Sequence, residues 1–159
     1  MEVVFWRKKK ANQLSVMGIV VSLTPFSYRV HDTIMQKDEE FGYFQGKGKD
    51  LFTYVMAASI ILSIRKLNDD YFTRYYSEIL KHLEDHYSNI GKICSDFNDY
   101  IRINYHSDNR LDATVLQWLH ERVGTGDVSN EVEIKILADG VWNIFDAYDN
   151  WFEKNDMPI

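Results

Sequence analysis

Apolar residues recur at helical spacing along most of the chain. In one stretch they fall three or four residues apart, at Phe72, Tyr76, Ile79, Leu83 and Tyr87. A later stretch repeats the pattern with Ile93, Phe97, Tyr100, Ile101 and Tyr105. Positions with this spacing share one side of an α-helix, so both stretches predict helices that bury one face and leave the other in water.

The stretch from Leu51 to Ile64 has a different pattern, because it is apolar on nearly every side. Asp50 is suited to cap its start, and Arg65 and Lys66 suit the negative end of the helix dipole. We expect a helix over about residues 50–66 that forms the buried centre of the molecule. The helix is too short for a membrane span, which needs about 20 apolar residues.

Few residues interrupt this helical pattern. The chain has two prolines, and its eight glycines lie mainly at the predicted ends of helices. Further helices are predicted from about 11 to 23, from Thr24 and Pro25 to Gln36, from Asp112 to Gly124, and from Asn130 onward, where Asn130 and Glu133 have the spacing of a capping box. The pattern predicts an all-α protein: a single irregular bundle of about six or seven helices, in one domain covering residues 1–159.

The composition agrees with a folded protein. The 159 residues are 45% hydrophobic and carry a net charge of −6, which excludes a disordered chain. The acidity disfavours a general nucleic-acid or anionic-membrane surface. Cys94 is the only cysteine, so no intramolecular disulfide can form, and a cytoplasmic location is the simplest interpretation.

The first ten residues form a basic N-terminal arm. Arg7, Lys8, Lys9 and Lys10 follow Trp6, and the arm has a net charge of +3, which leaves −9 for the rest. The arm could touch an anionic lipid or a nucleic acid, but a solvated arm is the favoured interpretation. The apolar stretch from Leu14 to Phe26 loosely resembles a secretory signal, yet no small-residue cleavage motif follows it, and membrane insertion is not expected.

The last predicted helix carries two stripes. One is apolar and must face the core; its members are Ile134, Leu137, Val141, Phe145, Tyr148 and Phe152. The other predicts a partner-binding surface of Asp139, Trp142, Asp146, Asp149 and Glu153. Residues 131–159 hold seven acids against two lysines, so this surface would attract a basic protein and anchor it through the indole. The alternative is that Trp142 packs beneath a neighbouring segment.

Two histidines form the main candidate for a metal site. His82 and His86 lie four residues apart, a spacing by which a helix supplies two metal ligands. A helical wheel, however, places His86 in an apolar stripe and His82 at its margin, so core or boundary histidines are the favoured interpretation. The sequence indicates no third ligand, and no cofactor is expected.

The remaining motifs give little catalytic chemistry. The glycine-rich segment from Gly42 to Asp50 lacks the spacing of a phosphate-binding loop, although its aromatics and lysines could contact a single-stranded nucleic acid. A packed loop between helices is favoured instead. No serine-nucleophile motif is present, and Cys94 lies on a predicted apolar face, where we expect an inert thiol.

These observations favour a non-enzymatic protein-binding module. We expect an acidic inhibitor or immunity-type protein that neutralises a basic, nuclease-like partner. The alternative is a metal-dependent helical hydrolase that uses His82 and His86. The sequence does not identify the partner, the biological process or the oligomeric state.

Overall fold

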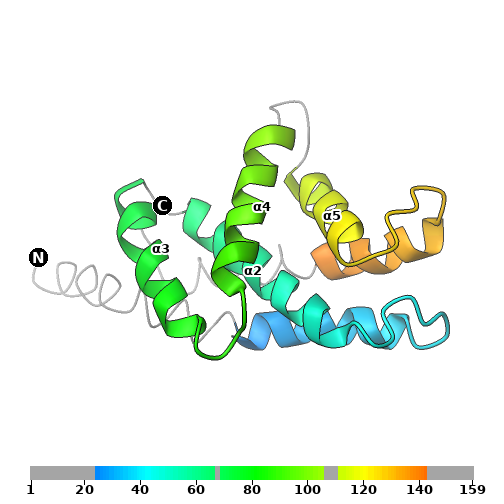
Figure 1. Ribbon diagram of the computed structural model, residues 1–159. Helices are drawn as coiled ribbons and strands as arrows, with labels where there is room; N and C mark the ends of the chain where they lie inside the picture. Colours follow the sequence, from blue (N-terminus) through cyan, green and yellow to red (C-terminus); the bar gives the residue numbers. More distant parts are fainter. Residues whose placement is uncertain (1–23, 67–68, 106–110, 143–159) are drawn as a thin grey trace, which may run out of the picture.

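The computed structural model describes residues 24–66, 69–105 and 111–142, and Figure 1 shows the arrangement of their helices. Within these ranges all regular structure is helical and no strand occurs, which confirms the all-α prediction. The helices are residues 24–37, α2 (Gly48–Lys66), α3 (Asp69–Leu83), α4 (Ile90–Asn104), α5 (Leu111–Arg122) and residues 131–142. The predicted helix over residues 11–23 and the basic N-terminal arm lie outside the described residues.

Helix α2 contributes the largest share of the described core. It packs against α3, α4 and α5, and most extensively against α4, which lies across it in Figure 1. Its side chains are almost continuously buried from Val55 to Leu62. This burial follows from the apolar run in the sequence, because each such side chain gains about 1.5–3 kcal/mol on leaving water. That α2 is the centre of the whole bundle remains a prediction.

The helices of residues 24–37 and 131–142 pack closely at one glycine. A Cβ atom added at Gly140 would lie 2.5 Å from Cδ1 and 2.6 Å from Cγ1 of Ile34, so no larger residue fits without a shift. Nearby, Lys37 Nζ donates a hydrogen bond of 2.7 Å to Asp139 Oδ2. Two segments far apart in the sequence are thereby fixed side by side.

The glycine-rich segment is a packed loop, as predicted. Asp38 is fully buried, and its two carboxylate oxygens accept hydrogen bonds from the backbone N–H groups of Tyr43 (2.9 Å) and Phe44 (2.7 Å). The Phe44 ring is also fully buried, while Gly42 and Gly46 adopt positive φ angles of 74° and 80° that favour glycine. This loop is therefore held by one internal carboxylate and one core aromatic.

The loop before the last described helix is built around a buried glutamate. Glu133 N donates to Asn130 Oδ1 (3.2 Å), which confirms the N-terminal half of the predicted capping box. The Glu133 carboxylate is fully buried and accepts hydrogen bonds from Thr125 N (2.6 Å) and Thr125 Oγ1 (2.7 Å). His120 Nε2 lies 3.4 Å from the same carboxylate. Glu133 thus joins α5, the loop and the following helix.

No helix within the described ranges combines the length and apolarity that crossing a bilayer requires.

Candidate functional site

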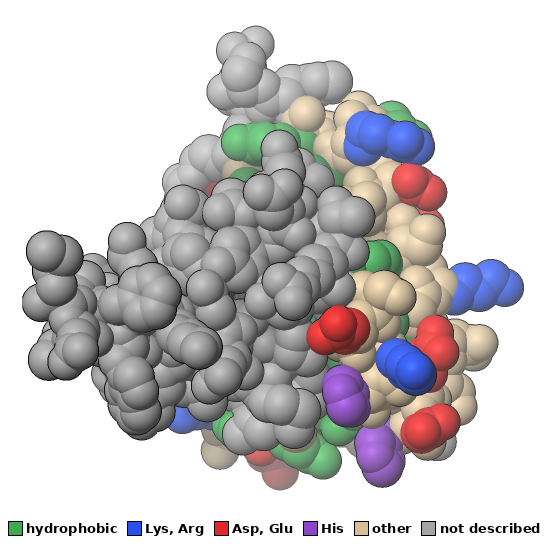
Figure 2. Space-filling model, turned by 90° about the vertical axis from the view of Figure 1, so that its left-hand side faces the viewer, with side chains coloured by type: hydrophobic (Ala, Val, Ile, Leu, Met, Phe, Trp, Pro, Cys, Tyr) green, Lys and Arg blue, Asp and Glu red, His purple; other side chains and the backbone are tan. Residues whose placement is uncertain are grey.

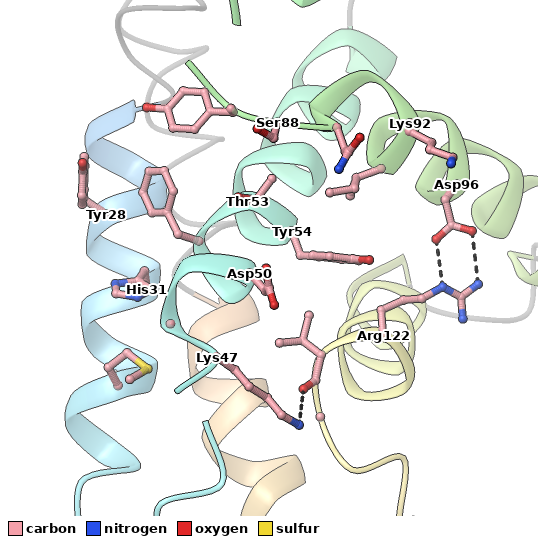
Figure 3. A pocket seen from close by; sticks show the side chains of 18 of the residues that line it. Tyr28, His31, Lys47, Asp50, Thr53, Tyr54, Ser88, Lys92, Asp96 and Arg122 are labelled. Carbon is pink, nitrogen blue, oxygen red and sulfur yellow. Dashed lines mark hydrogen bonds and ion pairs between the residues drawn. The ribbon is translucent and has the colours of Figure 1, made fainter. Parts of the chain in front are cut away.

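An open groove runs along the N-terminal half of α2 (Figure 3). Its walls come from the helix of residues 24–37, the start of α2, the turn between α3 and α4, the first turns of α4 and the end of α5. The cavity volume is about 1310 Å³. Pockets for small molecules usually measure about 300–1,000 Å³, so this groove has room for a larger ligand.

One wall of the groove is aromatic. The ring centroid of Tyr28 lies 4.5 Å from that of Phe52, which lies 5.7 Å from that of Tyr87. We call these three residues the aromatic shelf. His31 approaches Phe52 edge-on, with the centroids 5.9 Å apart. Tyr28 is 52% exposed, so the shelf offers apolar ring surface to the groove.

The opposite wall carries a charged network. Asp96 Oδ2 accepts hydrogen bonds from Trp118 Nε1 and Arg122 Nε, both at 2.9 Å, and Asp96 Oδ1 accepts one from Arg122 Nη2 at 3.3 Å. A two-point contact of this kind fixes the orientation of both groups. The hydrogen bond from Arg122 is the largest cause of a lowered pKa at Asp96, and the bond from Trp118 adds to it while burial opposes both.

This network predicts a pH-dependent contribution to stability. The pKa of Asp96 is below its ordinary value of 3.8 in the folded protein, so the carboxylate stabilises the fold above that value. The contribution is lost as the pH falls through the lower, folded pKa. Urea unfolding at several pH values should show that Asp96→Asn is less stable than the wild type at neutral pH and that the difference shrinks in acid.

Asp99→Asn is the matched control for this prediction. Asp99 pairs with Arg102 on the surface of the same helix, where both side chains are more than half exposed. Solvent screens such a pair, so we expect a change in unfolding free energy below about 0.5 kcal/mol at any pH. A constant difference between Asp96→Asn and the wild type from neutral to acidic pH would contradict the role given to Asp96.

The lower end of the groove is closed by Lys47. Its Nζ atom donates a hydrogen bond of 3.3 Å to the backbone oxygen of Val123, which joins the loop of residues 38–47 to the end of α5. Asp50, in the first turn of α2, also lines the groove and is exposed. Lys92 lines it on the α4 side (Figure 3). Lys92, Asp96 and Arg122 therefore lie across the groove from the aromatic shelf, and Lys47 lies at its lower end (Figure 3).

Two of the five predicted partner-binding residues lie in the described part of the chain. Trp142 is 51% exposed, whereas Leu137 and Val141 on the same helix are at most 2% exposed. The side chain of Asp139 is 35% exposed and forms its ion pair with Lys37. Asp146, Asp149 and Glu153 lie outside the described residues.

The structure corrects the prediction for the two histidines. His82 and His86 are both exposed, so they are not core or boundary residues. The reason is that α3 ends at Leu83, and the helical wheel does not apply to His86. Figure 2 shows histidine side chains on the surface, with acidic and basic groups interspersed on the same face.

The metal-ligand hypothesis gains no supporting geometry from this arrangement. Among the described residues, no three histidine, cysteine or acidic side chains come together in a way that could hold a metal ion. Elemental analysis of protein purified without chelator remains the test of the hydrolase alternative.

Cys94 lies on the buried face of α4, as the apolar pattern predicts. Its side chain is fully buried, and Ile90, Phe97 and Ile101 on the same helix are buried with it. Burial raises the pKa of the thiol to about 12, which keeps it protonated at neutral pH. The thiol therefore suits packing and not nucleophilic chemistry.

Sequence reasoning missed the groove itself. Its lining residues come from five separate segments, and no local pattern brings them together. The one available signal was the row of polar residues around Ser88 and Asn89, which sequence reasoning treated as a simple helix boundary. The buried cluster of Glu133, Thr125 and His120 was also missed, although the capping-box spacing identified the glutamate.

Comparison with known proteins finds no matching family model, no matching curated protein and no matching solved structure. The fold and the groove define the class: an all-α protein with an open groove of mixed polarity.

Proposed function

We propose that this protein is a non-enzymatic binding module that captures a protein partner through the surface around Trp142. The supporting observation is the half-exposed indole on a helix where Ile136, Leu137 and Val141 are buried. A large ring left in water is unfavourable by itself, and tryptophan is enriched among the residues that dominate binding energy at interfaces. A partner would remove this ring from water.

The partner in this proposal is a basic protein. Residues 131–159 hold seven acids against Lys135 and Lys154, so this part of the chain attracts positive charge. Asp139 precedes Trp142 by three residues, but Lys37 already neutralises part of its charge. In this proposal the indole is therefore the main anchor, and the carboxylates of Asp146, Asp149 and Glu153 add electrostatic attraction for the basic partner. An inhibitor that covers the nucleic-acid-binding surface of a nuclease is the form we propose.

The test compares Trp142→Ala with Ile103→Ala in the full chain. Ile103 is the matched control because it is another exposed apolar side chain, at 65% exposure, on a different helix. A partner captured from the native host by the wild-type protein should bind Ile103→Ala equally well. Its affinity for Trp142→Ala should fall at least about 30-fold, the loss typical of an interface hot spot.

Thermal unfolding of both variants shows whether the fold is preserved. Equal capture of the partner by the wild type and by a folded Trp142→Ala variant would refute the proposed surface. A captured partner with an acidic surface would refute the choice of a basic partner.

A further inference from the structure

The groove holds several polar side chains without a hydrogen-bond partner in the described part of the chain. Tyr54, Ser88, Asn89 and Lys92 line it, and their side chains make no hydrogen bond or ion pair with any of residues 24–66, 69–105 and 111–142. Figure 3 shows Tyr54 and Lys92 on facing sides of the space beside Arg122. Four polar groups along one groove are therefore available to a ligand.

The charges of the groove favour a negative ligand. Its cations are Lys47, Lys92 and Arg122, and its acids are Asp50 and Asp96. Asp96 is fully engaged with Arg122, so two lysines remain against one carboxylate. The groove therefore has a local excess of positive charge, although the net charge of the whole protein is −6. Acidic groups would find a complementary site here.

The shape and the remaining chemistry favour a polypeptide. The volume of about 1310 Å³ exceeds that of most small-molecule sites. An extended peptide presents alternating N–H and C=O groups, which match the side chains of Ser88, Asn89 and Tyr54. A polyphosphate chain fits less well, because it has no apolar group to place on the aromatic shelf.

We propose that this groove binds an extended acidic segment of a protein, whose apolar side chains lie on the aromatic shelf and whose carboxylates face Lys47 and Lys92. The site is separate from the surface around Trp142 and does not depend on the function proposed there. An occupant of this kind combines ring contacts on the aromatic shelf with charge-assisted hydrogen bonds to the two lysines.

The experiment uses three fluorescein-labelled probes and the full chain. The first is a synthetic peptide of alternating glutamate and phenylalanine with glycine spacers. The second replaces each glutamate by lysine, and the third is an oligothymidylate. Fluorescence anisotropy at neutral pH should show that the acidic peptide binds at least about tenfold more tightly than either of the other probes.

Two variants locate the binding site. Lys92→Glu reverses an exposed charge that has no partner among the described residues, and it should weaken binding of the acidic peptide about tenfold. Tyr28→Ala removes the exposed ring of the shelf and should also weaken binding. Lys81→Glu is the matched control, because Lys81 is an exposed lysine on α3 that does not line the groove.

The proposal fails if the acidic peptide does not bind, or if the lysine peptide or the oligothymidylate binds as tightly. It also fails if neither Lys92→Glu nor Tyr28→Ala weakens binding, or if Lys81→Glu weakens it as much as Lys92→Glu. Trp142→Ala separates this proposal from the previous one. The variant should bind the acidic peptide like the wild type, whatever its effect on the captured partner.

Discussion

Replacement of Trp118 by alanine is expected to lower the free energy of unfolding by about 4 kcal/mol. The indole is fully buried, and its ring centroid lies 4.4 Å from that of Phe97 and 5.2 Å from that of Tyr54. Its Nε1 atom also donates to Asp96. The substitution leaves a large cavity between α2, α4 and α5, and it removes a hydrogen bond. Urea unfolding monitored by circular dichroism measures the change.

Trp118→Phe is the control that separates packing from hydrogen bonding. A phenyl ring keeps most of the contact with Phe97 and Tyr54 but cannot donate to Asp96. We expect this variant to lose about 2 kcal/mol, less than the alanine variant. A loss below about 1 kcal/mol for Trp118→Ala would show that the packing described around this residue is wrong.

Removal of the Glu133 carboxylate should have the second largest effect. Glu133→Ala is expected to cost about 3 kcal/mol, because the Thr125 N–H and hydroxyl groups lose their acceptor and His120 loses its neighbouring carboxylate. The site is fully buried, so water cannot simply replace the lost oxygens. Hydrogen exchange should also show faster exchange of the Thr125 amide.

Glu133→Gln keeps nearly the same shape and one acceptor oxygen, while it removes the charge and replaces the second oxygen by an NH2 group. It should therefore be more stable than Glu133→Ala. Lys135→Ala on the same helix, where the side chain is exposed, should change the unfolding free energy by less than about 0.5 kcal/mol. Equal stability of the wild type and Glu133→Ala would contradict the structural role of this carboxylate.

The helices could be predicted from the sequence because each carries its own local signals. The apolar run of α2, the stripe of α4 and the Asn130 cap are properties of neighbouring residues, and the observed helix α2 begins within about two residues of the predicted start. Burial of Cys94 followed from the same periodicity.

The end of α3 could not be predicted in the same way. The stripe continues in the sequence to Tyr87, and neither proline nor glycine follows Leu83 before Gly91. The helix nevertheless stops at Leu83, and Asn89 adopts a left-handed conformation with φ 65° before α4 begins. A helical wheel drawn from the sequence assumes that the helix continues, so it could not place His86 correctly.

The candidate site was harder to predict than the fold because it depends on distant segments. The aromatic shelf needs Tyr28, on the helix of residues 24–37, and Tyr87, 59 positions later in the sequence, to contact the same Phe52 ring. The Asp96–Arg122 pair likewise joins two helices across 26 positions. For Trp142, the spacing within one helix left both an outward and a packed position open, and the structure leaves the side chain 51% exposed.

Site-specific photo-crosslinking at position 142 tests the central claim most directly. Trp142 is replaced by the photoreactive residue p-benzoylphenylalanine in the full chain, and the same residue at Ile103 provides the control. After irradiation in the native host, we predict a covalent adduct with a basic protein at position 142 and none with that protein at position 103. Absence of any adduct at position 142, or the same adduct at both positions, would contradict the claim that this surface captures a partner.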